Sequence, residues 1–111
     1  MAAKFELKQI KSGKFAFNLK ATNGQVILTS QQYKEKSSAQ NGIESVKKNA
    51  GSDANFTRNT SSSNQPYFVL KASNGQVIGT SEMYSSASAM ENGISSVMKN
   101  APNAQIDDIV A

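Results

Sequence analysis

The sequence predicts an α+β fold in which two tandem βββαβ repeats form a single antiparallel sheet, with both helices on one face and the terminal strands exchanged between the repeats. The first observation is a duplication: residues 15–50 return as residues 66–101 at a constant offset of 51 positions, without a gap. The second is a change of period within each copy, from the alternation of strands to the spacing of an amphipathic helix. A unit of about 50 residues is near the lower limit for a hydrophobic core of its own. We therefore expect one compact domain over residues 1–111, with repeat 1 at about 1–53 and repeat 2 at about 54–111.

Strands are predicted where apolar and polar residues alternate, in the first copy at residues 5–10, 15–21 and 25–30. A turn at residues 11–14 joins the first two, and a serine-rich turn at residues 61–65 takes its place in the second copy. Gly13 in the first turn has no glycine counterpart there. A further short strand is expected after the second helix, at residues 105–110.

Asn23-Gly24 lies between two of these strands and predicts a tight hairpin. A two-residue type I′ turn needs positive φ at both central positions, which Asn and Gly tolerate best. Such a turn would pair Lys20 with Ile27. One side of the sheet then gathers the core residues, which are Phe15, Phe17, Leu19, Ala21, Val26 and Leu28.

A capping box is predicted to open each helix. Ser37 precedes Gln40 by three positions, and Ser88 precedes Glu91 by three, so each side chain can satisfy a free backbone N–H at the helix start. Apolar residues then recur at helical spacing and define the core stripe, which is Ala39, Ile43, Val46 and Ala50 in one copy and Met90, Ile94, Val97 and Ala101 in the other.

Two glycines inside the predicted helices need a physical reason. Gly42 and Gly93 lie on the apolar side, although glycine in a helix costs about 1 kcal/mol relative to alanine. We infer a close approach, either of helix to sheet or of one helix to the other, and the approach of a substrate is a further alternative. Gly51 and Pro102 are expected to end the two helices.

The composition excludes several classes of chemistry. The chain has no cysteine and no histidine, so it lacks thiolates, disulfides, the commonest general base and the commonest metal ligand. Its first residues lack the apolar core of a signal peptide, and no apolar run reaches the roughly 18 residues that a membrane span needs. We expect a cytoplasmic, non-enzymatic protein with no cofactor, no metal and no membrane partner.

The net charge of +4 is distributed unevenly. Residues 1–55 hold nine lysines and four acidic residues, whereas residues 56–111 hold three basic and four acidic residues. A basic half attracts phosphate backbones, and lysines that only keep the surface soluble are the alternative.

The motifs LKATNGQVILTSQQY and SSAQNGIESVKKNA, with their second copies, resemble the YegP-like bacterial proteins, a domain of unknown function. The resemblance covers nearly the whole chain. It implies a βββαβ unit used twice in one sheet with exchanged terminal strands, and it brings no established activity, substrate or catalytic residue. Gly79 in place of Leu28 departs from the repeat and suggests a difference between the halves.

Few residues offer catalytic chemistry. Asp107 and Asp108 are adjacent, but neighbours in an extended segment point to opposite faces, so we interpret them as charges that protect an edge strand. Tyr33 and Tyr84 follow the hairpins and are expected to pack as half-buried rings, with ligand stacking as the alternative. A deep pocket that joined either tyrosine to a lysine would indicate a hydrolase or transferase.

The candidate binding surface is the face of the sheet that the helices leave open. Its predicted residues are Lys20, Ile27, Thr29, Tyr67, Val69, Lys71, Ile78 and Thr80. Contiguous apolar and basic side chains on such a face can mark an interaction site, whereas β-forming residues on a solvated surface are the alternative. We expect a monomeric binding module, a fused pseudo-dimer, that engages an unknown protein or other ligand. Weak, sequence-nonspecific nucleic-acid binding by the basic first repeat is the alternative function.

Overall fold

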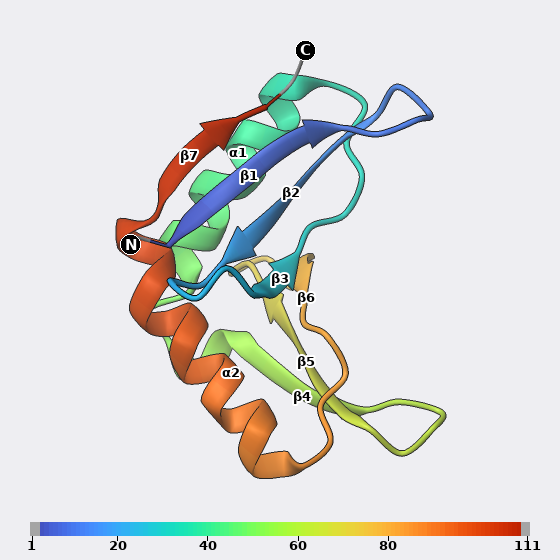
Figure 1. The fold of residues 1–111 in the computed structure, drawn as a ribbon, viewed down its shortest axis with the longest axis vertical. Helices are drawn as coiled ribbons and strands as arrows, with labels where there is room; N and C mark the ends of the chain where they lie inside the picture. Colours follow the sequence, from blue (N-terminus) through green and yellow to red (C-terminus); the bar gives the residue numbers. More distant parts are fainter. Residues whose placement is uncertain (1–2, 110–111) are drawn as a thin grey trace.

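The alternating segments form seven strands and the amphipathic segments form two α-helices (Figure 1). The computed structural model describes residues 3–109. In chain order the elements are β1 (Lys4–Gln9), β2 (Phe15–Lys20), β3 (Val26–Thr29), α1 (Lys36–Asn49), β4 (Phe56–Thr60), β5 (Pro66–Lys71), β6 (Val77–Thr80), α2 (Ala87–Asn100) and β7 (Gln105–Asp108). A short 3-10 helix follows each α-helix, at Asp53–Asn55 and at Ala101–Asn103.

The sheet runs in the order β4-β5-β6-β3-β2-β1-β7, so the two copies meet between β3 and β6. β7 belongs to the second copy but pairs with β1 of the first, which confirms the predicted exchange. β7 runs parallel to β1, so the prediction of a wholly antiparallel sheet is wrong at this edge. Figure 1 shows the reason: α2 ends beside the start of β1, and the chain that leaves α2 runs along β1 in the same direction. The predicted strand at residues 105–110 ends at Asp108, and Val110 lies outside the described residues.

Both helices pack on one face of the sheet and share a single hydrophobic cluster with it. All eight residues of the predicted helical stripes are buried. The sheet contributes Phe5, Phe17 and Phe68, each 0% exposed. Burying an apolar side chain of this size is worth about 1.5–3 kcal/mol, so this shared cluster is the main stabilising interaction of the fold.

The helices begin earlier than predicted. α2 starts behind Ser86, whose Oγ accepts a hydrogen bond from the Ala89 N–H at 3.1 Å. α1 starts behind Glu35, whose side chain makes no capping hydrogen bond. The predicted caps Ser37 and Ser88 lie inside the helices instead. Each helix follows a run of polar residues that offers several capping positions, and the sequence pattern does not select among them.

All four hairpins of the chain use the same three-residue turn. The last loop residue has a left-handed backbone in each, with φ of 87° at Gly13, 85° at Gly24, 87° at Gly75 and 65° at Asn64. Its N–H donates to the carbonyl three positions earlier, as from Gly24 to Ala21 at 2.9 Å. Asparagine tolerates this conformation better than other non-glycine residues, so Asn64 takes the place of Gly13 in the second copy.

The predicted two-residue turn is therefore wrong, and the register changes with it. Lys20 pairs with Val26 rather than with Ile27, and this shift leaves a β-bulge in β3. The same bulge occurs in β6 at Ile78. Ile27 and Ile78 are both 7% exposed and belong to the core cluster, because the bulge turns their side chains toward the helices.

Gly42 and Gly93 make room for tyrosine rings. Tyr33 stacks on Phe17 with the ring centres 6.3 Å apart. α1 passes over this ring at Gly42, where a Cβ would lie 2.9 Å from Tyr33 Cζ. Tyr84 lies beneath Gly93 in the same way. Of the three predicted alternatives, the approach of helix to sheet is the one found, because a Cβ at Gly42 would also lie 3.0 Å from the Phe17 ring of β2.

The duplication is broken where the copies meet. Leu28 and Gly79 occupy equivalent positions in β3 and β6, and a Cβ at Gly79 would lie 2.7 Å from both Cγ and Cδ2 of Leu28. A leucine at both positions would overfill the seam. One copy therefore supplies the side chain and the other supplies the space.

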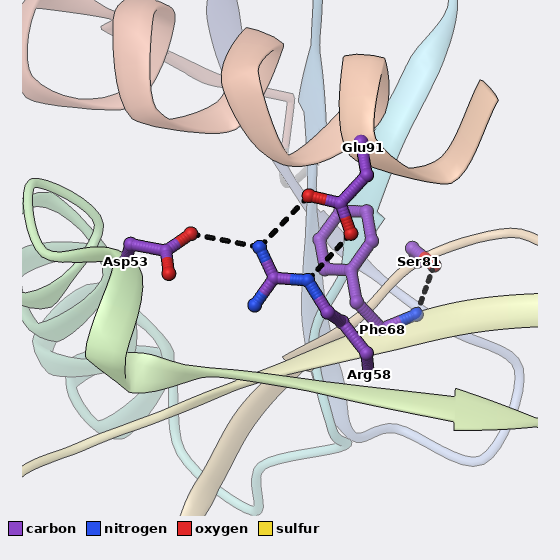
Figure 2. A network of polar contacts seen from close by, with 5 residues as sticks. All are labelled: Asp53, Arg58, Phe68, Ser81 and Glu91. Carbon is purple, nitrogen blue, oxygen red and sulfur yellow. Dashed lines mark hydrogen bonds and ion pairs between the residues drawn. The ribbon is translucent and has the colours of Figure 1, made fainter. Parts of the chain in front are cut away.

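The outer edges of the sheet also differ. Leu7 in β1 is fully buried and has β7 beside it, whereas its counterpart Arg58 lies in the uncovered edge strand β4. Figure 2 shows the Arg58 guanidinium between two carboxylates, with Nε 2.5 Å from Glu91 Oε2 and Nη2 2.8 Å from Asp53 Oδ1. The hydrogen bond from Arg58 lowers the pKa of Glu91 below its ordinary value. This cluster joins β4 to α2 and to the segment after α1, and a charge on an edge strand discourages pairing with another chain.

Exchanging the two residues at the seam tests whether they share one space. Leu28→Gly should lower the free energy of unfolding by about 2–5 kcal/mol because it opens a cavity. Gly79→Leu should lower it by about 1–3 kcal/mol because it overfills the seam. The double variant Leu28→Gly/Gly79→Leu should recover most of the combined loss in urea unfolding. Additive losses in the double variant would contradict a shared space.

Removing the guanidinium at the β4 edge should change the acid stability. The Arg58 contribution through Glu91 is full above about pH 4.3, the ordinary glutamate pKa, and is lost as the pH falls through the lower folded value. As the pH falls from the ordinary to the lowered pKa, the Tm of the native chain should therefore fall more steeply than that of Arg58→Met, and 1 M NaCl should reduce the difference. Glu44→Gln, at an exposed helix position outside the cluster, is the control. Equal slopes for the native chain and Arg58→Met would count against the ion pair.

Candidate functional site

Six of the eight predicted surface residues lie on the open face of the sheet, and these are Lys20, Thr29, Tyr67, Val69, Lys71 and Thr80. Thr29 pairs with Thr80 across the seam, and Thr80 pairs with Val69 on its other side, so the middle of the face is continuous. Val69 is 9% exposed and stands outside the core cluster, so its neighbours on the open face cover it. Ile27 and Ile78 are buried in the core, and their prediction as surface residues is wrong because the bulges rotate them away.

Lys20 and Lys71 are equivalent in sequence but differ in their partners. Lys20 Nζ lies 3.0 Å from Glu6 Oε1. The residue equivalent to Glu6 is Thr57, which carries no charge. Lys71 makes no ion pair with any residue that the structure describes. The second half of the face therefore offers a free cation where the first half has a neutralised one.

The β1–β2 turn lies at one end of the first copy (Figure 1), and four further lysines lie in or beside this turn in the strand ladder. Lys8 lies in β1, Lys11 and Lys14 lie in or beside the turn, and Lys34 follows the residue that bridges to the start of β2. We call Lys8, Lys11, Lys14 and Lys34 the lysine cluster. Within residues 3–109 none of them makes an ion pair. Their counterparts in the second copy are uncharged, namely Asn59, Ser62, Gln65 and Ser85.

The acidic residues do not form a site of their own. Asp107 lies 3.4 Å from Lys4, whereas Asp108 forms an ion pair with Lys36 at the start of α1. The two carboxylates therefore point to opposite faces of an edge strand, as predicted. Among the described residues, no three acidic side chains come together in a way that could hold a metal ion. No described helix has the length and apolar character needed to cross a bilayer.

A groove that the sequence pattern did not reveal lies between the β2–β3 turn of the first copy and α2 of the second. Two adjoining cavities of about 380 and 250 Å³ share Ala21, Asn23, Asn92 and Ser96. The hairpin side of the groove also contributes Thr22, Gln25 and Ile27. The second copy also contributes Tyr84, Ala89, Gly93, Ser95, Lys99 and Asn100. We call this site the α2 groove.

Polar and apolar groups share the walls of the α2 groove, and among the described residues its lining holds one cation and no acidic side chain. Burial and, to a smaller extent, the charge of Glu82 raise the pKa of Tyr84, so its phenol stays protonated at neutral pH and can donate a hydrogen bond. Tyr84 and Lys99 line different cavities of the groove. They do not form the paired tyrosine and lysine that would indicate a hydrolase or transferase. The arrangement is suited to holding a small polar molecule.

The duplication contains the signal that would have located this groove. Ten of its thirteen lining residues are identical to the residue 51 positions away, a higher share than in the repeat as a whole. The three exceptions are Thr22, Ala89 and Ser95, which correspond to Ser73, Ser38 and Glu44. The elements of one repeat taken alone do not bring these residues together, because the turn comes from one copy and the helix from the other.

Comparison with known proteins gives a family and no activity. A family model described as a domain of unknown function (DUF1508) matches the chain twice, at residues 11–56 and 61–108. The UPF0339 protein of Mannheimia succiniciproducens is 53% identical, over 95% of this chain and 93% of that protein. The UPF0339 protein YegP of Yersinia pestis is 50% identical, over 95% of this chain and 94% of that protein.

Solved structures agree with the fold. The solution NMR structure of YegP from E. coli, described as a protein of unknown function, has a TM-score of 0.94 and 42% identity, and the match covers 100% of this chain and 96% of that one. The UPF0339 protein of Shewanella oneidensis has a TM-score of 0.92 and 48% identity, over 99% of this chain and 93% of that one. The two family-model matches coincide with the two copies found in the sequence, and the relatives extend over nearly the same length. The chain therefore belongs to the YegP-like UPF0339 family, built from two copies of a domain of unknown function.

Proposed function

We propose that this protein is a cytoplasmic, monomeric and non-enzymatic binding module whose open sheet face docks an acidic segment of a protein partner. One observation supports this proposal above the others. The lysine cluster stands at one end of the open face with no acid paired to it, and the second copy has uncharged residues at every equivalent position. Four like charges held together without internal compensation create a local positive potential, which attracts and orients an acidic partner.

The rest of the face supplies the contacts that follow the electrostatic encounter. β2, beside the cluster, and β5, which carries Lys71, are three strand spacings apart, or about 14 Å. An extended acidic segment of four or five residues is long enough to reach from the cluster to Lys71. Between these ends lie the hydroxyls of Thr29 and Thr80 and the partly covered Val69. Tyr67, beside Val69, adds an aromatic ring of the kind that contributes strongly to interfaces.

Removing three of the four charges of the lysine cluster should weaken binding of an acidic peptide to this face. We expect Lys8→Gln/Lys14→Gln/Lys34→Gln to lower the affinity for a glutamate-rich peptide at least about tenfold at low salt, because each lost charge removes attraction that the second copy does not replace. Titration of the ¹⁵N-labelled full chain measures the affinity and shows which amides shift. Shifts confined to the open face, around Thr29, Val69 and Lys71, are expected in the native chain.

The matched variant installs the same charges in the other copy. Asn59→Lys/Gln65→Lys/Ser85→Lys should create a second peptide site at the opposite end of the sheet. Unchanged affinity in the glutamine variant, or shifts that avoid the open face, would refute docking at this surface.

Weak, sequence-nonspecific nucleic-acid binding remains the second candidate, because the same lysine cluster would contact phosphates. Three or four phosphate contacts on a duplex predict a slope of about −3 in a plot of log affinity against log salt concentration. The open face lacks the several exposed aromatic rings on which single-stranded bases stack in RNA-binding sheets, and this favours the protein partner. Tighter binding of a DNA duplex than of an acidic peptide of equal charge would reverse that preference.

A further inference from the structure

Most surface lysines differ between the two copies, and one exception lies in the α2 groove. Of the nine lysines in residues 1–55, only Lys20 and Lys48 have a lysine 51 positions later. Lys20 and Lys71 belong to the open face. Lys48 corresponds to Lys99, which is exposed and lines the larger cavity of the α2 groove. Lys99 is therefore a lysine that both copies hold and that lines a cavity.

Some retained residues of the groove have structural roles, and others do not. Asn100 Nδ2 donates to the Ser96 carbonyl at 2.8 Å and so fixes the last turn of α2. Asn92 and Lys99 have no comparable role, because both are exposed and the side chain of neither makes a hydrogen bond or ion pair within the described part of the chain. Both are nevertheless identical in the other copy. Exposed polar side chains without a partner in the protein are available to a ligand.

We propose that the α2 groove binds a small hydroxylated anion of the size and chemistry of a sugar acid or sugar phosphate. Lys99 supplies the positive charge for the anionic group. The Asn92 amide, the hydroxyls of Ser95 and Ser96 and the phenol of Tyr84 supply neutral hydrogen-bonding groups along the walls. The larger cavity, about 380 Å³, lies within the range of small-molecule sites. This site is distinct from the open sheet face and does not depend on it.

The equivalent positions of the other copy carry one change that alters the charge. Ser95 corresponds to Glu44, four positions before Lys48 on α1. Positions four apart are neighbours on a helix, so a carboxylate at this position lowers the local positive potential and repels an anion. The structure thus assigns one anion site to each chain, in the α2 groove.

Titration of the ¹⁵N-labelled full chain with two defined anions tests this site. D-glucuronate and glucose 6-phosphate, at constant ionic strength and at concentrations up to about 20 mM, would reveal a Kd near 1 mM. We expect at least one of them to shift the amides of Asn92, Gly93 and Ser96 saturably, and neutral D-glucose to leave them unchanged. The two anions distinguish a carboxylate ligand from a phosphate ligand. Saturable shifts with neither anion, or equal shifts with D-glucose, would overturn the proposal.

The duplication provides matched variants, all at exposed positions. Lys99→Gln should weaken binding at least about tenfold because it removes a charge-assisted contact, and Ser95→Glu should do so because it adds a repelling carboxylate. Lys48→Gln, the same substitution in the other copy, should leave the affinity unchanged. Glu44→Ser should create a second site, with saturable shifts at Asn41 and Gly42. An equal loss in Lys48→Gln and Lys99→Gln would overturn the assignment to α2.

Discussion

Between β3 and β6, where the two copies meet, the backbone ladder of the described strands holds a single residue pair, Thr29 with Thr80. The hydrophobic cluster, in contrast, runs without interruption through both copies. α1 packs on β5 and β6 as well as on β1 and β2, and α2 packs on β3 as well as on β5. Each helix therefore covers apolar surface from both copies. Burial of apolar surface is the dominant favourable term in folding. The packing of each helix on both copies therefore stabilises their association more than the backbone pairing of β3 with β6 does.

Fusion of the two copies in one chain lets equivalent positions take different residues. Near the pseudo-twofold axis two identical side chains would compete for one space, and Leu28 with Gly79 resolves the conflict. At the outer edges the asymmetry comes from connectivity. The segment after α2 lies along β1, but the segment after α1 has to continue into β4 itself. β4 is therefore an uncovered edge, and it carries Arg58 with two carboxylates where β1 carries the buried Leu7.

The two proposed binding surfaces differ in whether their residues occur in both copies. The lysine cluster occurs in one copy only, and a single patch of charge on a broad sheet is suited to one macromolecular partner. The residues that line the α2 groove are mostly identical to those 51 positions away, and its size and its polar groups are suited to a small molecule. Identity between the copies does not by itself mark a binding residue. Gly42 and Gly93 are identical and buried for a packing reason, the tyrosine rings beneath them.

The sequence by itself determined the repeat, the strands, the two amphipathic helices, their buried stripes and the packing role of Tyr33 and Tyr84. These features depend on the spacing of apolar residues and on residues close together in the chain. The duplication repeats each of them in the second copy. Part of the open face was also predictable, because Lys20, Thr29, Tyr67, Lys71 and Thr80 follow from alternation.

Only the tertiary structure decided the rest. Asn-Gly is compatible with more than one turn, and the extra loop residue moved Ile27 and Ile78 from the surface to the core. The parallel direction of β7 depends on where α2 ends relative to β1. The α2 groove depends on the packing of one copy's turn against the other copy's helix. Local patterns encode which face of a segment is apolar. Which residues pack against that face is decided only when both copies fold together and fill one shared core.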